Sequence, residues 1–98
     1  MLPPLSRGAL TQQMAAARSK VGLSIRRAAA IAGVPASTAQ GWLEGRHLPT
    51  PSLMPQFITL LRALQLVTVQ NETAWVDALN RMRRSSIVAE PPYVGLRP

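Results

Sequence analysis

The stretch LSIRRAAAIAGVPASTAQGW, residues 23–42, predicts two short helices joined by a tight turn. Ser24 is a suitable N-cap for the first helix because its hydroxyl can accept a bond from a free backbone N–H. That helix is expected to reach Ala32. Gly33 can then end it, since glycine takes the left-handed conformation without a steric penalty.

The second helix of the pair is expected over residues 36–44. Pro35 precedes it, at a helix start where a missing N–H donor costs nothing. Gly45 is placed to close it. Two short helices with a glycine-containing turn between them make up the helix-turn-helix geometry.

Small and apolar side chains would hold these two helices together. Ala29 lies four residues before Gly33, where the helices cross closely and a small residue is needed. The side chains expected to lock the pair are Ala28, Ala32, Val34, Ala39 and Trp42. Packing therefore explains why this segment is so rich in alanine.

Three further helices are expected around the pair, and no alternating strand pattern occurs in the chain. Residues 8–21 carry an apolar stripe at helical spacing, with Ser6 as a plausible N-cap and Gly22 as a stop. A fourth helix is expected over residues 53–66. Asn71 is expected to cap a fifth helix. The inward side chains of that last helix would be Trp75, Val76, Leu79 and Met82.

We therefore predict an all-α fold, a five-helix bundle. The expected domain organisation is a flexible leader (residues 1–7), a helix-turn-helix domain (residues 8–84) and a disordered linker toward a downstream module (residues 85–98).

The chain is strongly basic. Its 98 residues include 11 Lys and Arg against 4 Asp and Glu, for a formal net charge of +7. Residues 1–50 hold six cations and one acid, or +5, and every cation except Lys20 is arginine. A basic field of this kind favours a polyanion, most often nucleic acid, with a solvated basic surface as the alternative.

Several functional classes are disfavoured. With no cysteine, one histidine and 4 acidic residues, the chain lacks the ligands for a metal site, and no cofactor is expected. The carboxylates are widely spaced and no nucleophile has a paired base, so an enzyme is not expected. The chain has neither a long apolar run nor a signal-peptide layout, and we therefore expect a cytoplasmic protein without a membrane contact.

Over residues 8–84 the chain resembles the Cro and phage-repressor (XRE-type) family of helix-turn-helix domains. The resemblance rests on Leu23, Ser24, Ala28, Ala29, Gly33, Val34, Ser37, Thr38, Trp42, Gly45 and Pro49. It implies a five-helix domain of a transcriptional regulator whose partner is double-stranded DNA. The helix at residues 36–44 would then enter the major groove.

The resemblance also implies which residues touch DNA. Residues facing the base edges would be Ser37, Thr38, Gln40 and Gly41. Gln40 is suited to a bidentate pair with adenine. Phosphate contacts would come from Arg26, Arg27 and Arg46, and such contacts position the protein without reading sequence.

The sequence departs from the family pattern at Ala36 and Gly41, where long polar base-reading residues are common, and at three further positions. Ile25 replaces a polar residue, Pro35 replaces the usual Ser or Thr cap, and Leu43 replaces a Glu that would pair with Arg18. An alternative function is therefore a protein-interaction or autoinhibitory domain that has lost DNA binding. An exposed patch of Ala36, Ala39 and Gly41 would favour it if Arg26 and Arg46 were also buried or paired. A continuous positive strip flanking the helix would favour DNA.

The final segment, EPPYVGLRP at residues 90–98, resembles the start of the STAND-type NTPase modules of actinobacterial regulators. It implies that the chain is the N-terminal domain of a larger protein, with NTPase and repeat domains downstream. The chain has no phosphate-binding loop of its own. Two-fold dimers are usual in the repressor family, but no dimer surface is evident in this sequence.

Overall fold

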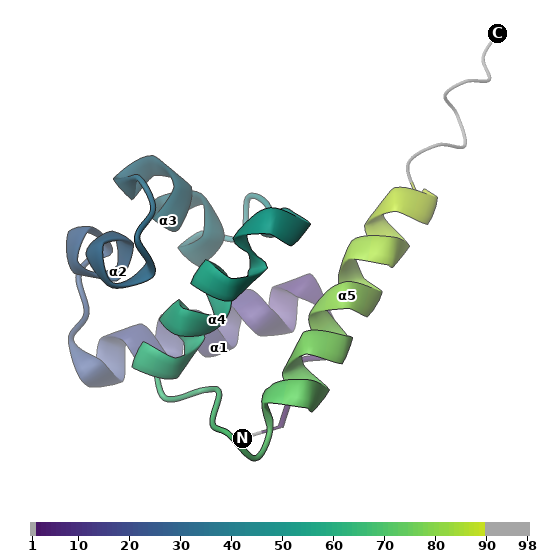
Figure 1. Ribbon diagram of the computed structural model, residues 1–98, viewed down its shortest axis with the longest axis horizontal. Coiled ribbons are helices and arrows are strands. Elements are labelled where there is room, and N and C mark those ends of the chain that lie inside the picture. The colour runs from purple at the N-terminus through teal and green to yellow at the C-terminus, as the bar shows by residue number, and fades with distance from the viewer. Residues whose placement is uncertain (1, 90–98) are drawn as a thin grey trace, which may run out of the picture.

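The computed structural model describes residues 2–89, and their secondary structure is entirely helical. The elements are α1 (Arg7–Val21), α2 (Ile25–Ala32), α3 (Ala36–Leu43), the 3-10 turn η1 (Pro51–Leu53), α4 (Met54–Ala63) and α5 (Glu72–Ala89). The predicted all-α, five-helix fold is confirmed. Helices α2 and α3 lie at one end of the molecule and α5 at the other (Figure 1).

The predicted ends of α1 and α2 are confirmed. Ser6 accepts a bond from the Ala9 amide, and Ser24 accepts one from the Arg27 amide, at 3.1 Å in both cases. Gly22 and Gly33 follow the two helices in the left-handed conformation, with φ of 69° and 72°. Local sequence signals thus set the length of both helices.

The core lies between α1, α3, α4 and α5. Met14, Phe57 and Trp75 are among its largest fully buried side chains. Trp42 of α3 meets the Phe57 ring edge-on, with centroids 5.1 Å apart and ring planes at 88°. This is a favoured aromatic geometry, and it fixes α3 to α4.

The fourth helix differs from its predicted range of residues 53–66. Leu53 belongs to η1, and α4 ends at Ala63. The chain then turns through Gln65, a non-glycine residue with φ of 65°. After this turn both Leu66 and Val67 are buried in the core.

The loop after α4 is held by Asn71, the residue expected to cap α5. Its side-chain amide donates to the Leu66 carbonyl at 3.1 Å and its Oδ1 accepts from the Thr68 amide at 2.7 Å. Its own carbonyl receives the Trp75 amide as α5 begins. Asn71 therefore organises the loop as well as the start of the helix.

Helix α5 buries Trp75, Leu79 and Met82 as predicted, with Val76 half-buried. It continues to Ala89, so the first residues of the expected linker are helical. The predictions for residues 90–98 fall outside the described residues. Within residues 2–89, no helix combines the length and hydropathy that crossing a membrane requires.

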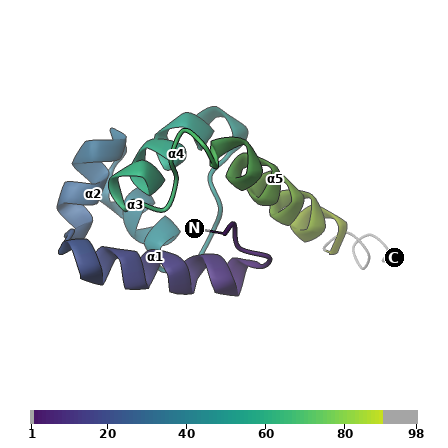
Figure 2. The same ribbon diagram turned by 90° about the horizontal axis from the view of Figure 1, so that it is seen from below.

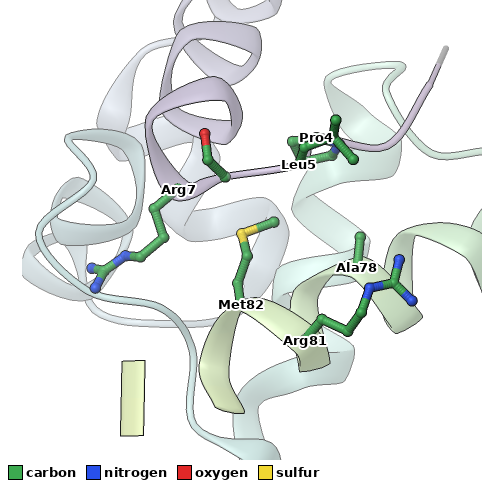
Figure 3. Close-up of a pocket in the computed structure, with 7 residues that line it drawn as sticks. Pro4, Leu5, Arg7, Ala78, Arg81 and Met82 are labelled. Atoms are coloured by element: carbon green, nitrogen blue, oxygen red, sulfur yellow. The ribbon is translucent and has the colours of Figure 1, made fainter. Parts of the chain in front are cut away.

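The segment before α1, expected to be a flexible leader, contacts the domain through part of its length, while Leu2 and Leu5 are exposed. Pro4 is buried, and Gln13 of α1 donates to the Leu2 carbonyl at 3.2 Å. The segment and α5 together line a pocket of about 480 Å³. Met82 projects into the space between the leader and α5 (Figure 3). Proline fits here because it fills apolar space without burying an N–H.

Candidate nucleic-acid interface

Helices α2 and α3 form the predicted helix-turn-helix. Ala28 and Ala39 are fully buried, and Ala29 and Ala32 are each 5% exposed. The Val34 amide closes the turn on the Ala29 carbonyl at 3.1 Å. The alanine-rich segment is therefore the contact between the helices, as predicted, and the pair forms one end of the molecule (Figure 2).

The first turn of α3 is open to solvent. Ser37 is exposed and Thr38 is half-buried. Pro35 supplies no side-chain cap, but its carbonyl accepts the Thr38 and Ala39 amides at 3.0 and 3.1 Å. The hydroxyls predicted to touch DNA are thus carried at the exposed start of a fixed helix.

Gly41 is buried, although it was predicted to face the bases. The imidazole of His47 lies where a Cβ of residue 41 would project, and would clash with it. The Arg46 amide, which donates to the Gly41 carbonyl at 2.9 Å, folds the chain back so that the ring can reach this position. The sequence contained no signal for this contact beyond the missing side chain of Gly41.

The three arginines predicted to contact phosphate differ in whether they have an ion-pair partner. Arg26 and Arg27 of α2 are exposed, and neither forms an ion pair with any residue in the described part of the chain. Arg46 is also exposed, but its Nη2 lies 3.2 Å from Oε1 of Glu44. The second carboxylate oxygen of Glu44 accepts a 2.9 Å bond from Gln40.

Glu44 is a residue of the candidate site that the sequence-based prediction missed. Its position four residues after Gln40 was a usable signal, because side chains at that spacing share a helix face. The pairing with Arg46 gave no such signal, since it depends on the path of the chain after α3 ends.

Arg7 was also missed. Its guanidinium donates to the Gly45 carbonyl at 3.4 Å and so connects the start of α1 with the turn after α3. Gly45 itself has φ of 76° and lies against Thr11. These contacts fix the backbone that carries Glu44 and Arg46.

The departures from the repressor pattern have local explanations. Leu43 is 7% exposed and belongs to the core, while Ile25 packs partly buried against it. Arg18, whose expected carboxylate partner is missing, instead donates to the Leu23 carbonyl at 3.5 Å. Leu43 is thus a core residue, and Arg18 has a backbone carbonyl as its partner.

No described part of the chain gathers three or more His, Asp or Glu side chains into a potential metal site. His47 lies over Gly41 at the end of α3. The polar groups of this region are therefore the hydroxyls of Ser37 and Thr38, the Gln40 amide, the Glu44 carboxylate, the His47 imidazole and the guanidinium groups.

The arrangement defines a helix-turn-helix protein. A family model described as a helix-turn-helix domain matches residues 9–70. The chain therefore belongs to the helix-turn-helix domain family. Searches of curated proteins and of solved structures gave no match.

Proposed function

We propose that this protein is the double-stranded-DNA-binding module of a transcriptional regulator. The observation that carries the proposal is that the start of α3 and the two arginines of the preceding helix, Arg26 and Arg27, are all exposed, and that these arginines have no ion-pair partner among the described residues. In helix-turn-helix proteins the second helix lies in the major groove while the first crosses the backbone. This would put Ser37 and Thr38 at the base edges and the two arginines near phosphates.

Backbone contacts would supply most of the affinity. Each guanidinium that neutralises a phosphate releases counterions, which makes binding strongly dependent on salt. The hydroxyls of α3 can contact either bases or phosphates, and only Gln40 is suited to a bidentate pair with adenine. We therefore propose modest sequence specificity.

The alternative, a protein-interaction or autoinhibitory domain, depended on an exposed patch of Ala36, Ala39 and Gly41. Ala39 and Gly41 are buried, and only Ala36 is exposed. The pairing of Arg46 with Glu44 is the observation that favours this alternative. The absence of ion pairs at Arg26 and Arg27 among the described residues favours DNA, and we retain DNA binding as the proposal.

The proposal is tested by replacing Arg26 and Arg27 together with Gln and measuring duplex binding by fluorescence anisotropy at several salt concentrations. We expect about tenfold weaker binding at low salt, and a salt slope that is smaller by roughly two, since two phosphate contacts are lost.

The matched control replaces Arg81 and Arg84 with Gln, which removes the same charge from exposed positions of α5. This control should bind DNA nearly as well as the unmodified protein. Equal losses in both double variants would show that only net charge matters. No binding by the unmodified protein at low salt would reject the proposal.

The resemblance of residues 90–98 to the start of an NTPase module supports a further part of the proposal. We propose that the domain acts within a larger regulator, joined by this segment to a nucleotide-binding module. Two copies of the DNA-binding domain would then be brought together by association of that module. Comparing the oligomeric state and DNA affinity of this domain and the longer protein tests this arrangement.

A further inference from the structure

Glu44 lies at the end of α3 and uses both oxygens of its carboxylate on neighbouring side chains. Gln40 Nε2 donates to Oε2 at 2.9 Å, and Arg46 Nη2 lies 3.2 Å from Oε1. Gln40 and Arg46 come from opposite sides of Glu44 in the chain. One acidic residue therefore contacts two of the groups that we propose to touch DNA.

A carboxylate offers a guanidinium what a phosphate offers it, namely a negative charge with paired oxygens. The amide of Gln40 gives one of its two protons to Glu44, which fixes the direction of the side chain and leaves its second proton and its Oε1 for a base. For the Nη2 group of Arg46 to contact a phosphate, its ion pair with Glu44 must be exchanged for a contact with the nucleic acid.

From this geometry we infer that Glu44 is an intramolecular competitor of DNA: it pairs with Arg46 in the free protein and so lowers the affinity of the module. The inference rests on the proposed function. It identifies Glu44 as an affinity-determining residue for which the Cro-like pattern gave no role.

The competition is graded because the pair is open to solvent. The side chains of Arg46 and Glu44 are 58% and 47% exposed, so water and salt weaken their attraction. Their backbone is fixed by the bond from Arg7 to the Gly45 carbonyl and by that from the Arg46 amide to the Gly41 carbonyl. The two charges therefore stay close, but their ion pair is weak enough to exchange with a phosphate.

The test is Glu44→Gln, which removes the charge and keeps the size of the side chain. We expect about threefold to tenfold tighter binding to a random-sequence duplex at low salt, as expected for the loss of one exposed ion pair and of one repulsive charge near the backbone. The salt slope should become steeper by about one, because Arg46 is released to a phosphate.

Glu72→Gln is the matched control. Glu72 is paired with Arg62, as Glu44 is with Arg46, but it begins α5, which starts at the bottom of Figure 1, away from α3. Both substitutions change the net charge by the same amount. The control should alter DNA affinity by less than twofold if position, rather than total charge, determines the effect.

A thermodynamic cycle separates competition from simple repulsion. If Glu44 acts by holding Arg46, most of the gain from Glu44→Gln should disappear in an Arg46→Gln background. An equal gain in both backgrounds would overturn the competition mechanism, and so would a gain no larger than that of the Glu72 control.

Weaker binding by Glu44→Gln would also overturn the inference, since Glu44 would then orient Arg46 for DNA. In each of these outcomes the unmodified protein still binds, so the proposed function stands. If no variant binds the duplex at any salt concentration, both the proposed function and this inference fail.

Discussion

Gly45 shows how one residue controls the segment that follows α3. It has φ of 76°, and an added Cβ would clash with the Thr11 hydroxyl of α1 and lie 3.2 Å from its Cγ2. Gly33, in the turn between α2 and α3, has nearly the same φ of 72° but open space around its Cα. A substitution at Gly33 therefore measures the cost of the left-handed backbone alone, whereas one at Gly45 adds the cost of the contact with Thr11.

We expect Gly45→Ala to lower the free energy of unfolding more than Gly33→Ala does. Gly33→Ala should cost about 1 to 2 kcal/mol for the left-handed conformation alone. Gly45→Ala should cost this amount plus the displacement of Thr11. Urea unfolding followed by circular dichroism measures both values.

Thr11→Ala provides the control, because it removes the two atoms that the new Cβ would approach most closely. In this background the cost of Gly45→Ala should fall to that of Gly33→Ala. If the two glycine substitutions cost the same in the unmodified protein, the proximity of Thr11 has no energetic importance.

At the scale of the element, α2 depends on its N-cap. Ser24→Ala removes the acceptor for the Arg27 amide and should cost about 1 kcal/mol of unfolding free energy. Hydrogen exchange at the Arg27 amide should accelerate as well. Ser19→Ala, at an exposed position within α1, is the control and should leave stability unchanged or slightly raised. Equal effects of the two substitutions would contradict a capping role.

The elements also show what a sequence can and cannot predict. Caps and glycines are local signals, and they correctly placed the ends of α1 and α2. The predicted end of α4 was wrong because no glycine or proline marks the place where the helix stops. The chain turns at Gln65 because Leu66 and Val67 are buried, which is a tertiary effect.

The candidate site likewise contains residues that the sequence could place and contacts that it could not. Ser37, Arg26 and Arg27 lie exposed on the elements where the sequence placed them. The contacts of Gly41 with His47 and of Glu44 with Arg46 could not be predicted. They depend on the path of the backbone beyond α3, which long-range contacts such as the bond from Arg7 to Gly45 help to fix.

On the scale of the whole molecule, the contact between α5 and the N-terminal segment lies apart from the surface that we propose for DNA. Met82 is 7% exposed and packs beside the N-terminal segment (Figure 3). Met82→Ala should cost about 2 to 3 kcal/mol of unfolding free energy. The DNA affinity of the folded fraction should change by less than twofold, as measured by anisotropy at 10 °C. A large loss of affinity would mean that α5 or the leader takes part in binding.

The two tryptophans have a consequence of their own. Trp42 belongs to α3 and Trp75 to α5, and both indoles are shielded from water. Their emission will shift to longer wavelength when their surroundings open, so single Trp→Phe variants can follow each end of the bundle separately. Coincident midpoints would mean that α3 unfolds only with the rest of the domain. An earlier transition at Trp42 would mean that α3 unfolds locally before the rest of the domain. The helix that we propose for the DNA major groove would then be the least stable part of the bundle.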